Sequence, residues 1–91
     1  MKHVDIINEA LGLLKPRGDT YGTVRENHER IARIAGELTG RPLTARDVAL
    51  VLVAVKLSRI AQSPEYLDSY ADAINYLSFA GEFATDVGWE G

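Results

Sequence analysis

The sequence predicts an all-α fold of four helices in an antiparallel arrangement, and three observations support this prediction. Apolar residues recur at helical spacing, capping residues and helix breakers divide the chain into four segments, and no segment offers a partner strand. The chain has 91 residues, near the lower limit for a domain with a self-sufficient core. We therefore expect one domain over residues 1–91, with a loose tail from about residue 87.

The first helix is predicted from about Lys2 to Lys15, since Pro16 closes a segment of helical spacing. The second is predicted from Thr23 to about Thr39, because Thr23 and Glu26 have the spacing of a capping box and glycine and proline follow. A helical wheel of this second segment predicts an inner face of apolar residues: Val24, Ile31, Ile34, Ala35 and Leu38.

The third helix is predicted from its cap at Thr44 to about Gln62. A buried strand is the alternative, because the run 48–55 is apolar and rich in valine. The cap and the length of about eighteen residues favour the helix. For the fourth helix, the run Ser63-Pro64-Glu65 predicts a cap, a proline at the first position and an acid in the first turn, with an end at about Asp86.

Composition limits the functional classes. A helix that is apolar on nearly every side needs cover that so short a chain cannot supply, so we expect a homo-oligomer, a dimer or larger. The net charge of −3 gives no support to stable nucleic-acid binding, and the absence of cysteine excludes thiolate metal sites. The apolar run is far shorter than a membrane span, and the start lacks the features of a signal peptide. We expect a cytoplasmic protein with no membrane partner.

The candidate site lies where charged residues interrupt the apolar segments. Lys56 and Arg59 end the third helix, and Asp68 and Asp72 begin the fourth. If these helices are antiparallel neighbours, the two cations lie close to the two acids. Charges in such a place are paired or meet a ligand, because burial of an unpaired charge is costly. One alternative is an ion-pair clasp between the helices, and the other is a pocket in which the cations hold phosphate.

The fourth helix also carries a stripe of polar residues, formed by Asp68, Asp72 and Asn75 and flanked by Tyr76. Two carboxylates one helical turn apart have the oxygen ligands that Mg²⁺ prefers. Glu26 and Glu29 on the second helix have the spacing of a second metal pair, but the wheel turns them outward, where Glu26 caps the helix and Glu29 pairs with Arg33.

Asn27 and His28 are polar residues that the wheel places on the inner face of the second helix. An inward polar group needs a partner, and for His28 a hydrogen bond to a backbone carbonyl is favoured over a metal ligand. Tyr21 lies in a turn-rich loop before the same helix, whose N-terminus is a possible anion site, although a turn with Tyr21 packed on the core is favoured. No serine–histidine or cysteine–histidine nucleophile pattern is present.

Five separate segments resemble a family of short phage and prophage proteins of uncharacterised function, and they lie within about residues 18–81. The segments are Asp19-Thr20-Tyr21-Gly22, Arg25-Glu26-Asn27-x-x-Arg30-Ile31-Ala32, Asp47-Val48-Ala49-Leu50, Lys56-Leu57-x-Arg59 and Asp68-Ser69-Tyr70-x-Asp72-x-x-x-Tyr76.

That family in turn resembles, more distantly, the all-α nucleotide pyrophosphohydrolases of the MazG and dimeric dUTPase type and phage domains associated with nucleotide modification. The distant resemblance implies a MazG-like fold and Mg²⁺ held between two acidic motifs. Glu26 and Glu29 match the first motif and Asp72 the aspartate of the second, but Ser69 stands where the second motif has an acid, with Asp68 as the nearest substitute. The acidic set is incomplete, which weakens the case for catalysis more than the case for nucleotide binding.

Three functional hypotheses follow. The first is an oligomeric phage-type protein that binds a phosphorylated nucleotide, with sequestration of a host signalling nucleotide as one use. Its binding residues would be Tyr21, Asn27, His28, Lys56, Arg59, Asp72, Asn75 and Tyr76. The second is a nucleoside triphosphate pyrophosphohydrolase whose Mg²⁺ is held by Glu26, Glu29, Asp68 and Asp72. The third is a structural or interaction protein in which the charged cluster is only a clasp.

Overall fold

A computed structural model describes residues 1–14 and 22–85 of the chain, and in these residues the only regular structure is helical. The helices are α1 (His3–Gly12), α2 (Val24–Thr39), α3 (Ala45–Gln62) and α4 (Leu67–Thr85). The predicted all-α class is therefore confirmed. Among the described residues no helix is long and apolar enough to cross a membrane.

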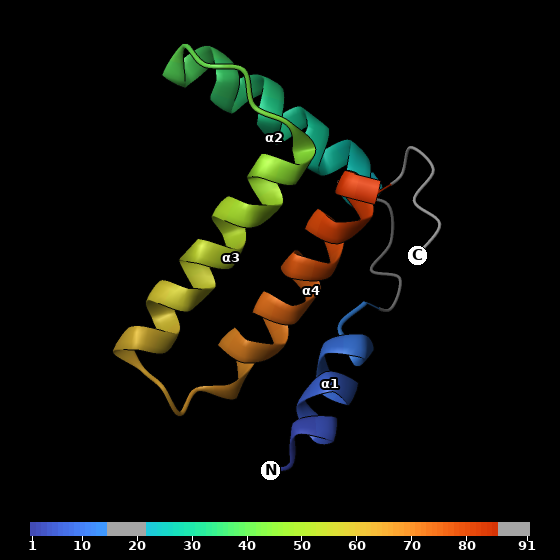
Figure 1. The fold of residues 1–91 in the computed structure, drawn as a ribbon, viewed down its shortest axis with the longest axis vertical. Coiled ribbons are helices and arrows are strands. Elements are labelled where there is room, and N and C mark those ends of the chain that lie inside the picture. The colour runs from blue at the N-terminus through green and yellow to red at the C-terminus, as the bar shows by residue number, and fades with distance from the viewer. Residues whose placement is uncertain (15–21, 86–91) are drawn as a thin grey trace.

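Helices α3 and α4 form an antiparallel hairpin, which is the centre of the fold (Figure 1). Helix α1 lies along the other side of α4, whereas α2 crosses the far end of the hairpin instead of lying beside it. This arrangement therefore differs from a bundle with four parallel axes, in which each helix covers its neighbours along their whole length.

Local signals account for the helix boundaries. At the start of α3, the Thr44 hydroxyl accepts a hydrogen bond from the Asp47 amide at 3.1 Å, and the Asp47 carboxylate accepts one from the Thr44 amide at 2.9 Å. The Thr44 amide that donates to the carboxylate is the main cause that lowers the pKa of Asp47, and the Thr44 hydroxyl beside the carboxylate lowers it further. This capping box sets the helical start of a segment whose valines alone fit a strand equally well. Helix α2 ends at Thr39 and is capped by Gly40, whose positive φ of 72° is a conformation that glycine adopts without strain.

The predicted start of α4 is wrong by about three residues. Ser63 does not cap α4; its amide donates to the carbonyl of Arg59 at 2.8 Å and closes α3. Residues 63–66 then form a turn, in which the Tyr66 amide donates to the Ser63 carbonyl, and the Tyr70 hydroxyl donates to the Pro64 carbonyl. The backbone groups that a helix start at Ser63 would need are used by this turn. The predicted helix end at Asp86 and the tail lie outside the described residues.

The predicted inner face of α2 is also wrong for a single chain. Only His28 and Ala32 are buried on this helix, and Ala35 is half-buried. The other apolar residues of that face are exposed, namely Val24, Ile31, Ile34 and Leu38. The physical reason is the crossing: α2 meets the hairpin with its first half, and its second half extends past the start of α3 (Figure 1).

Candidate functional site

An ion pair joins the two helices of the hairpin. The Lys56 ammonium lies 2.9 Å from a carboxylate oxygen of Asp72, and the side chains are 14% and 33% exposed, respectively. The sequence placed this cation and this acid together, because the end of α3 and the start of α4 are adjacent in an antiparallel hairpin. Lys56 is largely withdrawn from solvent, whereas Asp72 keeps contact with water, so the enclosed environment expected for the whole cluster applies to Lys56 only.

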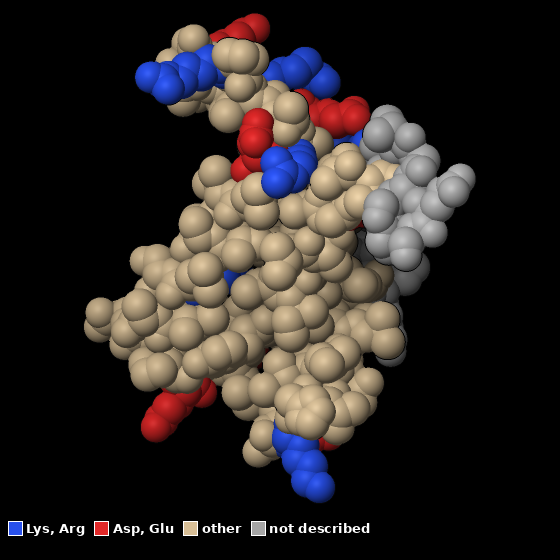
Figure 2. All heavy atoms as spheres, viewed as in Figure 1, with Lys and Arg blue, Asp and Glu red and all other residues tan. Residues whose placement is uncertain are grey.

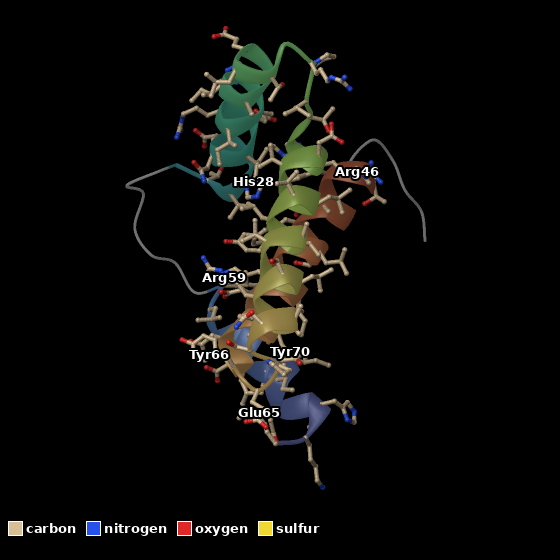
Figure 3. All side chains as sticks on the ribbon, turned by 90° about the vertical axis from the view of Figure 1, so that its left-hand side faces the viewer. His28, Arg46, Arg59, Glu65, Tyr66 and Tyr70 are labelled. Atoms are coloured by element: carbon tan, nitrogen blue, oxygen red, sulfur yellow. The ribbon has the colours of Figure 1, made fainter. Side chains whose placement is uncertain are left out.

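Arg59 and Asp68, the other two members of the predicted charge cluster, are exposed. Within the described part of the chain, the Arg59 guanidinium has no ion-pair partner, although it lies one helical turn from Lys56. Figure 3 shows Arg59 and Tyr66 on the same side of the hairpin, with His28 further along that side, whereas Arg46 and Tyr70 lie on the opposite side. We call the side that carries Lys56, Arg59 and Tyr66 the polar side.

The pKa of Tyr66 is shifted by a neighbouring acid, Asp68. The Asp68 carboxylate beside its hydroxyl raises the pKa of Tyr66 above its ordinary value of 10.0, first as a hydrogen-bond acceptor that favours the protonated phenol and then through its negative charge. The folded protein thus holds the phenolic proton more tightly, so this contribution to stability is present below pH 10 and is lost as the pH rises through the raised pKa.

We expect Asp68→Asn to move the ionisation of Tyr66 back toward its ordinary pKa, because the carboxylate that accepts the phenolic hydrogen bond is gone. The measurement is an alkaline titration of tyrosinate absorbance, with the signal of Tyr66 isolated by subtracting the curve of Tyr66→Phe. An unchanged titration midpoint in Asp68→Asn would mean that the two side chains do not interact in solution.

His28 lies in an aromatic cluster that holds α2 on the hairpin. Its ring centroid is 5.8 Å from that of Phe79 and 5.5 Å from that of Phe83, and the Arg25 guanidinium lies 4.8 Å from the centre of the Phe83 ring. The Nδ1 atom donates to the Val24 carbonyl at 2.8 Å, which agrees with the core histidine favoured from the sequence. The other ring nitrogen, Nε2, is buried without a hydrogen-bond partner in the described residues.

Two further predicted site residues belong to the packing of α4. Asn75 is buried, and its side-chain amide donates to the Ala10 carbonyl of α1 at 2.9 Å. Tyr76 is half-buried, and its ring packs edge-on against Phe79 with 6.2 Å between centroids. Asn27 is half-buried on α2, and Tyr21 lies outside the described residues.

The four acids proposed for a metal site are not brought together. In the described ranges, no three side chains of histidine, cysteine, aspartate or glutamate are grouped so that they could hold a metal ion. Glu26 accepts a bond from the Thr23 amide in the predicted capping box. Glu29 pairs at 3.9 Å with Arg25, one turn before it, and not with Arg33 as the sequence predicted. Glu26 and Glu29 therefore interact within or next to their own helix, Glu26 as a cap and Glu29 as an ion-pair partner.

Two hollows on the described surface lie away from Lys56. One, of about 500 Å³, is formed by the second half of α2 and the segment after it, and Arg33, Glu37 and Arg41 lie on its wall. No pattern in the sequence indicates this hollow, because it depends on the path of residues 40–43 beside α2. That path is close, since the carbonyl of Arg41 would lie only 3.1 Å from a Cβ atom at Gly36. The other, of about 180 Å³, lies between α1 and α4 beside Glu9 and Asp68.

Comparison with known proteins places the chain in a family. Residues 5–84 match the family model described as DUF6378, a domain of unknown function. The chain belongs to the DUF6378 family. A relative of this DUF6378 domain is the Gene 55 protein of Mycobacterium phage L5, which is 34% identical over 61 residues, equal to 66% of this chain and 39% of the phage protein.

The DUF6378 domain thus spans well under two thirds of that phage protein's length. The similarity confirms the resemblance to phage proteins of uncharacterised function that the five sequence segments indicated. No solved structure matches the chain.

Proposed function

We propose that this DUF6378 domain is a small oligomeric protein of the host cytoplasm that binds a phosphorylated nucleotide on the polar side of the α3–α4 hairpin. One observation carries the proposal. The guanidinium of Arg59 has no ion-pair partner in the described residues, and it lies one helical turn from the largely withdrawn ammonium of Lys56, on the same side as the exposed ring of Tyr66.

The donors of the two cations suit a phosphate group. A lysine ammonium has three N–H donors, so Lys56 can keep its bond to Asp72 and still donate to a phosphate oxygen. A guanidinium binds two phosphate oxygens at once, and no acid among residues 1–14 and 22–85 pairs with Arg59. The Tyr66 ring, which is exposed, offers a flat apolar surface on which a base can stack.

The remaining predicted residues support the site indirectly in this proposal. Asp72 fixes the Lys56 ammonium, Asn75 holds α1 against α4, and Tyr76 and His28 belong to the aromatic packing between the site and α2. Binding without turnover would sequester the nucleotide, which is a use open to a phage protein acting against a host signalling nucleotide.

Mg²⁺, which the distant resemblance to MazG-type pyrophosphohydrolases implies, does not fit the described residues. Glu26 and Glu29 are engaged within α2, and no three potential metal ligands are grouped in the part of the chain that the structure describes. The MazG-like relationship stays a proposal about fold, and we propose no hydrolytic step.

The test is thermal melting against a panel of nucleoside mono-, di- and triphosphates, followed by titration of the nucleotide that raises the midpoint most. We expect Arg59→Ala to weaken the affinity by about tenfold to a hundredfold, as for a lost hydrogen bond to a charged group. Arg46→Ala is the matched control, because Arg46 is an exposed arginine of the same helix on the opposite side of the hairpin. Equal losses in the two variants, or no response to any nucleotide, would contradict the proposal.

The second candidate is a structural or interaction protein, and the Lys56–Asp72 pair itself favours it. The ion pair at 2.9 Å joins the two central helices, and holding them together is enough to explain why both charges are there, without any ligand. This candidate predicts that mutating Lys56 or Asp72 changes stability and that no nucleotide raises the melting midpoint.

A further inference from the structure

The side of the hairpin opposite the polar side is apolar and largely uncharged. On α3 its positions are Leu50, Ala54, Leu57 and Ala61, and on α4 they are Tyr70, Ile74, Leu77 and Gly81. We call these eight residues the hairpin face. Figure 2 is viewed onto this face. Uncharged side chains, drawn in tan, cover the hairpin, and most charged side chains lie at the margins. Leu57 and Leu77 are 55% and 56% exposed.

The single chain is short of a core. Its buried apolar residues in the described ranges are five alanines and Val48, and none of the large side chains there is fully buried. The chain exposes 6911 Å², whereas a monomer of 10.0 kDa exposes about 5,200 Å². A standard stable interface removes about 800 Å² from each partner. The excess area is large enough for one such interface.

We propose that the hairpin face binds the same face of a second copy of this chain, so that two α3–α4 hairpins form a four-helix core. Both helices present the face at positions i, i+4, i+7 and i+11. On α3 two leucines alternate with two alanines, and on α4 three large residues are followed by Gly81. The large side chains of one copy can enter the spaces beside the small residues of the other. A face without charge is compatible with itself, as a two-fold interface requires. The proposal does not depend on nucleotide binding.

A second copy fits this face better than a lipid surface does. Helices that lie on membranes carry rows of lysine and arginine beside the apolar face to meet anionic lipids. The net charge of this chain is −3, the hairpin face has no cation, and Arg46 at the end of this side lies beside the acid Asp47. The cover is needed for the core itself, because the central helices bury so little in one chain. A copy of the chain is present wherever the chain is made.

The first test is sedimentation velocity of the full chain over a range of concentrations. We expect a species of twice the chain mass or a multiple of it, and we expect Leu57→Lys to raise its dissociation constant by at least about tenfold. Gln62→Lys, which adds the same charge at an exposed polar position of α3, is the matched control. Leu38→Lys tests the rival apolar stripe of α2, because Leu38 is 82% exposed. A monomeric wild type, or dissociation by Leu38→Lys but not by Leu57→Lys, would overturn the proposal.

The second test keeps the interface intact, in case Leu57→Lys fails to fold. The chain has no cysteine, so Ala54→Cys and Gln62→Cys each introduce a single thiol at a position that is exposed in the single chain. We expect the thiol at position 54 to react with iodoacetamide at least about tenfold more slowly than the one at position 62, and to become more reactive on dilution. Equal rates at all concentrations would overturn the proposal, as would co-sedimentation of the wild type with phosphatidylglycerol vesicles.

Discussion

Replacing Asn75 by aspartate is expected to destabilise the fold by about 2–4 kcal/mol at neutral pH, the range for a buried carboxylate without a partner. The side-chain amide of Asn75 donates to the Ala10 carbonyl at 2.9 Å in a buried position. In Asn75→Asp an ionised carboxylate would face that carbonyl oxygen, and two acceptors repel each other. The free energy of unfolding from urea titration measures the loss.

The pH dependence of Asn75→Asp distinguishes this mechanism from a loss of shape. A protonated carboxyl can donate to the Ala10 carbonyl as the amide does, so the folded state raises the pKa of the new group above the ordinary value of about 3.9. The penalty is then absent below that value and grows as the pH rises through it. Asn75→Leu is the control, with an expected cost of about 1 kcal/mol and no pH dependence beyond that of the wild type. A pH-independent penalty in Asn75→Asp would contradict the assigned hydrogen bond.

The helices were predictable because their signals are local. The capping boxes at Thr23 and Thr44 and the glycine at position 40 each act within one or two turns, and the structure has all three. The start of α4 was mispredicted because a cap in sequence competes with the neighbouring helix for the same backbone groups, and the Ser63 amide closes α3. A pattern along the chain does not decide which of two helices takes such a residue.

Of the candidate site, only the contact between the two adjacent helices of the hairpin was predictable from the sequence. Lys56 and Asp72 meet because the hairpin is antiparallel with a short turn. Periodicity gives the apolar side of α2 but not what covers it, since the angle between α2 and the hairpin is a tertiary property. For the same reason the wheel placed Ile34 and Leu38 inside, although both are exposed in one chain. The contact of Asn75 with Ala10 joins residues 65 positions apart, a separation for which the sequence has no signal.

Replacing Asp72 by alanine is expected to destabilise the protein by about 2 kcal/mol, because the Lys56 ammonium would lose its partner where its side chain is only 14% exposed. Fully buried pairs cost about 3–5 kcal/mol when one partner is removed. Water reaches Asp72, which is 33% exposed, so the smaller value applies here. The measurement is again the free energy of unfolding in urea, with Glu82→Ala, at an exposed acid of the same helix, as the control.

The double variant Lys56→Met with Asp72→Ala shows how much of that cost is an orphaned charge. Methionine keeps the apolar stem of lysine without its ammonium, so we expect the double variant to be at least as stable as Asp72→Ala alone, with a coupling of about 1–2 kcal/mol in the mutant cycle. If the pair serves only as a clasp, nucleotide has no effect on this coupling. If Lys56 also donates to a phosphate, as proposed, saturating nucleotide stabilises the wild type but not the double variant. Additive effects of the two mutations would contradict the 2.9 Å contact in solution.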